Sequence, residues 1–99
     1  RMVAVDRWFE ARQASPLPLA FYMVALAGEV GEAANILKKH MRGDFPLDGA
    51  NLEELGLELA DVEIYLRHLA RKAGVNLDQQ VERKIEICER RWNIPRECP

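Results

Sequence analysis

Residues 51–72, NLEELGLELADVEIYLRHLARK, have the apolar period of a long α-helix. Aliphatic side chains recur at alternating spacings of three and four residues, which is typical of a helix that packs along another helix. They are Leu52, Leu55, Leu59, Val62, Leu66 and Leu69. Asn51 with Glu54 three residues later has the spacing of an N-terminal capping box, and Gly74 is a suitable stop. The stretch predicts an amphipathic helix over residues 51–72.

Three more helices are predicted, and no segment alternates in the way of a strand. One covers residues 18–42, with Gly43 as its stop and lysines in its last turns, where the helix dipole favours cations. The others cover residues 3–13 and residues 77–92, the latter opened by a second capping-box spacing at Asn76. The 99 residues therefore predict one all-α domain, residues 1–99.

Composition excludes several classes of protein. With 48% hydrophobic and 30% charged residues, the chain is not disordered, and its net charge of -2 argues against a nucleic acid polymer as partner. No uninterrupted apolar run reaches the roughly 18 residues of a membrane span, and the opening RMVAVDRW lacks the apolar stretch of a signal peptide. Cys88 and Cys98 do not form a zinc-type pair. We expect a reduced, cytoplasmic protein with no membrane partner.

Acidic residues occur where both long helices are expected to face inward. On a helical wheel, Glu58 and Asp61 fall between two apolar edges of the helix over residues 51–72. In the preceding helix, Glu29 and Glu32 belong to the segment GEVGE and are surrounded by alanine, leucine and tyrosine. Each pair is three residues apart and so shares one helix face. The wheel predicts that all four carboxylates point into the bundle.

Such carboxylates need a partner, because a buried unpaired carboxylate costs several kcal/mol or takes up a proton. Lysines and arginines can supply the partner, and so can a divalent cation held between the two helices. The Glu-x-x-His pattern of di-iron bundles is missing, and ligation by carboxylates alone favours Mg²⁺ or Mn²⁺. Since Mg²⁺ often completes its shell with phosphate oxygens, a nucleotide polyphosphate is a natural ligand. A solvated acidic face is the competing interpretation.

Other residues have a functional and a structural interpretation side by side. Lys39, on the Glu32 side of its helix, can bind phosphate or compensate the helix dipole. Trp8 can stack on a base or pack in the core. Tyr65 can line a pocket or pack, and His68 is expected to pack. The two glycines of GEVGE predict the close approach of another backbone.

Three segments together resemble the all-α nucleoside triphosphate pyrophosphohydrolases, the MazG and dCTP/dUTP pyrophosphatase group. They are LAGEVGEAANILKK (26–39), ELGLELADVEIYLRHLA (54–70) and GVNLDQQVERKIEICERR (74–91). The ExxE…ExxD signature of that group is matched by Glu29, Glu32, Glu58 and Asp61. The resemblance covers roughly residues 19–91. It implies a four-helix MazG-like bundle completed by homo-oligomerisation as a homodimer or homotetramer.

The resemblance also implies an activity. In that group the four acids bind Mg²⁺ and are the catalytic residues, through an activated water that attacks a nucleoside triphosphate. The products are the monophosphate and pyrophosphate, and the role is nucleotide-pool house-cleaning or dNTP control. The group's K-x3-N-x2-R pattern on the last helix implies that Lys84 and Arg91 hold phosphate oxygens. Cys88 stands at the Asn position, and a thiol is a poor hydrogen-bond donor for a base or sugar pocket.

Two alternatives follow from the same residues. The chain can be a non-catalytic nucleotide-binding or protein-interaction bundle, which the Cys88 departure favours. It can also be an oligomerising scaffold whose acids pair with lysine or arginine across an interface.

Overall fold

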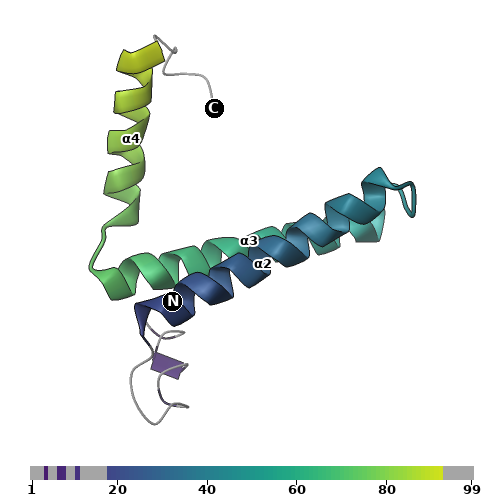
Figure 1. Ribbon diagram of the computed structural model, residues 1–99, viewed down its shortest axis with the longest axis horizontal. Coiled ribbons are helices and arrows are strands. Elements are labelled where there is room, and N and C mark those ends of the chain that lie inside the picture. Colours follow the sequence, from purple (N-terminus) through teal and green to yellow (C-terminus); the bar gives the residue numbers. More distant parts are fainter. Residues whose placement is uncertain (1–3, 5–6, 9–10, 12–17, 93–99) are drawn as a thin grey trace.

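The computed structural model describes residues 4, 7, 8, 11 and 18–92, and this part of the chain contains helices and no strand. Three helices follow one another: α2 (Leu19–Met41), α3 (Gly49–Ala73) and α4 (Leu77–Trp92) (Figure 1). The prediction of an all-α fold is confirmed. The helix predicted over residues 3–13 and the end of the chain fall mostly outside the described residues.

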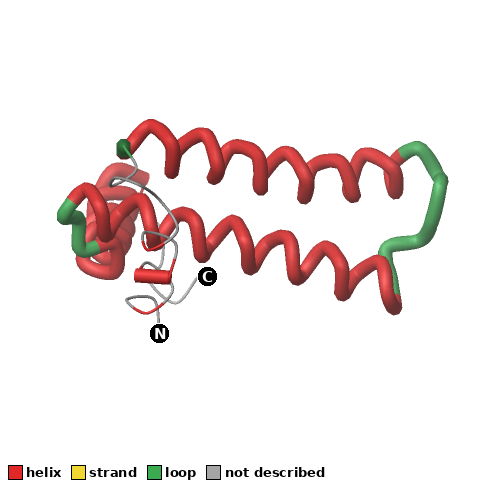
Figure 2. The backbone as a smooth tube through the Cα atoms, turned by 90° about the horizontal axis from the view of Figure 1, so that it is seen from below, coloured by secondary structure: helices red, strands yellow, loops and turns green. Residues whose placement is uncertain are grey.

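Helices α2 and α3 lie side by side as an antiparallel hairpin (Figure 2). Helix α2 ends at Met41, and Gly43 turns the chain with a φ of 85°. Helix α3 begins earlier than predicted, because Asp48, in extended conformation, precedes its first residue. The prediction that Asn51 caps the helix is therefore wrong. Asn51 lies within α3, and its side-chain amide donates to the Pro46 carbonyl at 3.2 Å.

The core of the hairpin is small and lies near the connecting loop. Ala33 and Ile36 from α2 and Leu55 from α3 are buried together. Phe45 and Leu47 of the loop pack against them. At the far end of the hairpin the side chains of Tyr22 and His68 form a ring cluster. These two side chains are the most deeply buried of all the described residues. The acidic residues lie between these two apolar regions.

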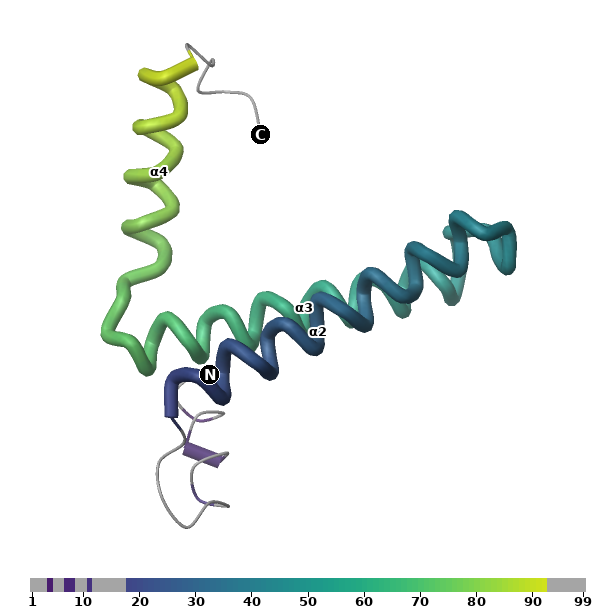
Figure 3. Tube along the Cα trace, in the orientation of Figure 1, coloured from purple at the N-terminus to yellow at the C-terminus, as the bar shows by residue number. Residues whose placement is uncertain are grey.

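The aliphatic seam of α3 is only half buried, and this departs from the expectation of one continuous packed seam. Leu55 is buried, and Val62 and Leu69 are half-buried. Leu52, Leu59 and Leu66 alternate with them and are exposed. Among the described helices, α3 has one neighbour along its length, α2 (Figure 3). The exposed half of the seam is the half that α2 does not cover.

Helix α4 leaves the hairpin at a steep angle (Figures 1 and 3). Gly74 ends α3 in the left-handed conformation, with a φ of 76°, which a glycine adopts without steric cost. The Asn76 side-chain oxygen accepts from the Gln79 N–H at 3.1 Å, so the predicted cap of α4 is confirmed. Arg67 of α3 reaches Asp78 of α4 at 3.4 Å.

Beyond this elbow, α4 does not pack along the hairpin, and none of its residues is buried. The described residues thus form a two-helix hairpin with a projecting third helix, and they do not close into a four-helix bundle. The radius of gyration is 16.9 Å. A compact chain of this length would have about 13 Å.

Helix α2 is the one described helix that is long and apolar enough to cross a membrane by length and composition. The expectation from the sequence concerned an uninterrupted apolar run, whereas α2 meets a criterion of length and mean hydropathy. The core helix of a water-soluble bundle meets the same criterion, and α2 has Glu29 and Glu32 at its centre.

Candidate metal site between α2 and α3

Three acidic side chains converge across the middle of the hairpin. Glu29 and Glu32 of α2 and Glu58 of α3 each place a carboxylate oxygen within 4.8 Å of the others. The spacing of three residues on α2 puts both of its acids on the side of α3, as the wheel predicts. Asp61 lies outside this tight cluster, one turn along α3, and is close enough for its charge to act on Glu29 and Glu58.

The cluster has buried oxygens that no described group satisfies. Glu29 and Glu58 are half-buried, and the Oε2 atom of each is buried without a hydrogen-bond partner. Glu32 is exposed and forms the open side, so the prediction that all four carboxylates point into the bundle is wrong for Glu32. The described part of the chain has the ion pairs Arg42–Asp44, Arg67–Glu63 and Arg67–Asp78, and none of these three includes an acid of the cluster.

Burial and mutual repulsion make two of these acids weak. Loss of hydration raises the pKa of Glu29 above its ordinary value, and the charges of Glu32 and Asp61 raise it further. The pKa of Glu58 is raised in the same way, first by desolvation and then by its hydrogen bond and repulsion with Glu32. Without a cation the cluster therefore holds protons more tightly than isolated carboxylates do.

A ring cluster adjoins the acids toward the far end of the hairpin. The His68 ring centroid lies 6.1 Å from that of Tyr22 and 6.0 Å from that of Tyr65. His68 is only 1% exposed, and burial, with a contribution from Arg71, lowers its pKa. It is a packing histidine, as expected. Desolvation and then the charges of Glu29 and Asp61 raise the pKa of Tyr65, which places this phenol beside the acidic cluster.

The other predicted site residues are not brought to the cluster within one chain. Lys84, Cys88 and Arg91 lie on α4, which contacts α3 at the elbow and does not contact α2. The Arg91 guanidinium carbon lies 5.4 Å from the Trp92 ring centroid. Trp8 is 54% exposed.

Lys39 lies two turns beyond Glu32 on α2, is exposed and forms no ion pair with it. The two glycines of GEVGE do not serve the role expected of them. A Cβ added at Gly28 or Gly31 would meet no atom within 4 Å, so no other backbone in the described part of the chain approaches there.

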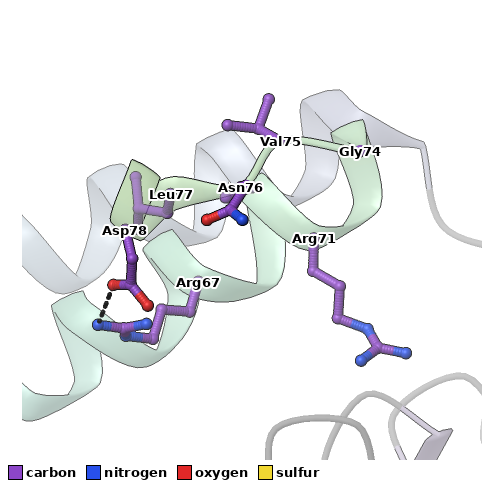
Figure 4. Close-up of a pocket in the computed structure, with 8 residues that line it drawn as sticks. Arg67, Arg71, Gly74, Val75, Asn76, Leu77 and Asp78 are labelled. Carbon is purple, nitrogen blue, oxygen red and sulfur yellow. Dashed lines mark hydrogen bonds and ion pairs between the residues drawn. The ribbon is translucent and has the colours of Figure 1, made fainter. Parts of the chain in front are cut away.

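The structure has a pocket at a different place, the elbow between α3 and α4 (Figure 4). It is lined by Arg67, Ala70, Arg71, Gly74, Val75, Asn76, Leu77 and Asp78. The Arg67–Asp78 pair spans it, and the Arg71 side chain extends away from that pair (Figure 4). The pocket contains none of the predicted metal ligands.

Two features, one beside the acidic cluster and one at the elbow, were not predicted from the sequence. The Tyr22 hydroxyl is buried without a hydrogen-bond partner among the described residues. Tyr22 and Glu29 are seven residues apart, which places both side chains on one face of α2. This spacing could have predicted that Tyr22 lies on the same side of α2 as the acids. The Arg67–Asp78 pair joins two helices across a turn, and the spacing rules for a single helix do not predict it.

Comparisons of the chain with protein-family models, with curated proteins and with solved structures find no match.

Proposed function

We propose that this protein hydrolyses (deoxy)nucleoside triphosphates to the monophosphate and pyrophosphate in a Mg²⁺-dependent reaction. The observation that supports the proposal is the convergence of Glu29, Glu32 and Glu58 within 4.8 Å. These ligands are hard oxygens contributed by two helices, a donor set that suits Mg²⁺ or Mn²⁺. The resemblance of the ExxE…ExxD pattern to the pyrophosphohydrolases supports the choice of reaction.

The residues of the cluster would bind the cation from different sides, according to how deeply each side chain is buried. Glu29 and Glu58 would hold the cation from within, through the Oε2 atoms that otherwise lack partners. The exposed Glu32 would hold it from the solvent side, where a triphosphate enters. Asp61 would add charge one turn along α3. Bound magnesium would supply Lewis acidity toward a water nucleophile and positive charge toward the phosphates.

The charges of Glu29 and Asp61 act on Tyr65, which makes this aromatic side chain a candidate for contact with a base or sugar. The assignment of Lys84 and Arg91 to the phosphates requires that an α4 helix reach the acids, either by a movement of the elbow or from another copy. A homodimer or homotetramer in the cytoplasm, acting in nucleotide-pool house-cleaning or dNTP control, completes the proposal.

A non-catalytic nucleotide-binding or protein-interaction bundle is the second candidate. It is favoured by the position of α4, which carries Lys84 and Arg91 away from the acids, and by Cys88 at the expected Asn position. This alternative predicts binding of nucleotide without release of pyrophosphate.

The test is pyrophosphate release from a panel of canonical and modified nucleoside triphosphates, with Mg²⁺ and with EDTA. Glu58→Gln removes one ligand charge at almost constant volume, and we expect it to lower turnover at least ~100-fold, as loss of a direct metal ligand should. Glu54→Gln is the matched control, since Glu54 is exposed one turn earlier on α3. Full turnover by Glu58→Gln would rule out the site, and a folded protein inactive on the whole panel would favour the binding bundle.

A further inference from the structure

The pocket between α3 and α4, which we call the elbow pocket, has a volume of about 440 Å³. Its lining comes from the last two turns of α3, from residues 74–76 and from the start of α4 (Figure 4). A volume of this size is in the range of sites that hold a small organic molecule. Arg67 lies nine residues beyond Glu58 along α3, which is roughly 13 Å, so the elbow pocket is separate from the acidic cluster.

Part of the lining of the elbow pocket is apolar. Ala70 of α3 is buried, Leu77 of α4 is half-buried, and Val75 between the two helices is 43% exposed. A ligand that covers Val75 removes apolar surface from water, and this favours binding. The apolar part of the lining therefore suits a ring or a short hydrocarbon group.

The polar part of the lining carries a positive charge. Arg67 and Arg71 are four residues apart, which puts both on one face of α3 with their Cβ atoms about 5–6 Å apart. Asp78 is the one acid among the lining residues, so two arginines and one aspartate leave a net charge of +1. The Asn76 side chain also lines the pocket and has an amide group that can donate. This set of donors favours an anionic group as the ligand.

A ligand can take over the ion pairs that Arg67 forms in this structure. Arg67 reaches Glu63 at 3.1 Å and Asp78 at 3.4 Å, and the side chains of these two acids are 62% and 82% exposed. Exposed ion pairs contribute little free energy, whereas a phosphate or carboxylate group can accept two parallel hydrogen bonds from a guanidinium. Arg71 is exposed and extends away from the Arg67–Asp78 pair (Figure 4). Rotation about its side-chain bonds, which is fast for an exposed residue, brings its guanidinium to the same anion.

We propose that the elbow pocket binds a small organic anion, with its phosphate or carboxylate group held by Arg67 and Arg71 and its apolar part against Val75. Asp78 gives up Arg67 when this ligand binds, so the ligand replaces the ion pair that links α3 to α4. The proposal does not rest on the hydrolysis of nucleotides, because none of the acids of the cluster lines the elbow pocket.

Isothermal titration calorimetry of the full chain in EDTA tests the proposal, with phenyl phosphate as the probe. EDTA removes divalent cations, so the acidic cluster, which is itself anionic, does not hold the phosphate group. We expect one phenyl phosphate to bind per chain with a dissociation constant of ~1 mM or below, inorganic phosphate to bind more weakly, and phenol not to bind. Phenylacetate carries a carboxylate in place of the phosphate, and the tighter of the two probes tells which anionic group the pocket prefers.

Three variants separate the elbow pocket from attraction by charge alone. Arg71→Gln should weaken the binding of phenyl phosphate at least ~10-fold, because a charge-assisted hydrogen bond is lost. Lys72→Gln is the matched control: it removes the same charge from the next residue, which does not line the pocket, and it should bind like the wild type. Asp78→Asn should tighten binding, because it removes the carboxylate that competes for Arg67.

Amide chemical shifts of the wild type locate the probe without any variant. The amides of Gly74, Val75 and Asp78 should shift most as phenyl phosphate is added. Failure of both phenyl phosphate and phenylacetate to bind overturns the proposal, and so do shifts that gather on α2 instead of the elbow. Equal weakening by Arg71→Gln and Lys72→Gln, or weaker binding by Asp78→Asn, also overturns it.

Discussion

Glu58→Gln should change how the stability of the metal-free protein depends on pH. The pKa values of Glu29 and Glu58 are raised in the folded protein above 4.5, their ordinary value, which is the value expected after unfolding. At any pH between 4.5 and these raised values, the folded protein binds more protons than the unfolded chain. The free energy of unfolding should therefore fall as pH rises through this window.

The expected magnitude follows from the number of perturbed carboxyl groups. The slope of the logarithm of the unfolding constant against pH equals the number of protons released on unfolding. With two raised carboxyls, the cluster contributes at most about two protons in the wild type. Glu58→Gln leaves Glu29 alone and reduces the contribution to at most about one. At neutral pH the variant should be more stable than the wild type in EDTA, because a charge repulsion is removed.

Urea unfolding followed by far-UV circular dichroism, in EDTA from about pH 4 to about pH 8, measures this slope. His68 acts in the opposite direction, because burial lowers its pKa and stability is lost as pH falls below its ordinary value of 6.5. That contribution is common to both proteins and cancels in the difference between them. Glu54→Gln should keep the wild-type slope. Equal slopes for Glu58→Gln and wild type would refute the raised pKa of Glu58.

Two further predictions concern the fold. Leu55→Ala should destabilise the protein toward the low end of the roughly 2–5 kcal/mol typical of a buried leucine, because Phe45 and Leu47 can move into the space. Chemical denaturation measures this loss of unfolding free energy. Leu52→Ala, at a half-exposed position of the same helix, should lower the unfolding free energy clearly less. Equal losses for the two variants would contradict the assignment of the core. Asn76→Ala removes the acceptor at the start of α4 and should cost about 1 kcal/mol. Faster amide exchange in the first turn of α4 would confirm it, and unchanged exchange would argue against the cap.

The helices and the pairing of acids on one face could be predicted because both depend on neighbours in the chain. A period near 3.6 residues, a glycine at the end of α3 and an asparagine before α4 act over one or two turns, and the structure bears these out at Gly74 and Asn76. The same local rule placed Glu29 with Glu32, and the meeting of both with Glu58 needed only that two adjacent helices form a hairpin. The start of α3 was missed, since Asp48 and Asn51 are both good caps and the loop decided between them.

The sequence by itself thus determined the all-α class, the ends of α4 and the placement of Glu29 and Glu32 on one side of α2, because these depend on spacings along a single helix. Tertiary structure alone decided which half of the leucine seam is buried, that Asp61 lies beyond the tight cluster, and that α4 projects from the hairpin. These outcomes depend on the direction from which a second helix approaches, and on pairs such as Arg67–Asp78 that form across a turn. Periodicity places an apolar row on a helix, but only the packing geometry decides whether another surface covers it.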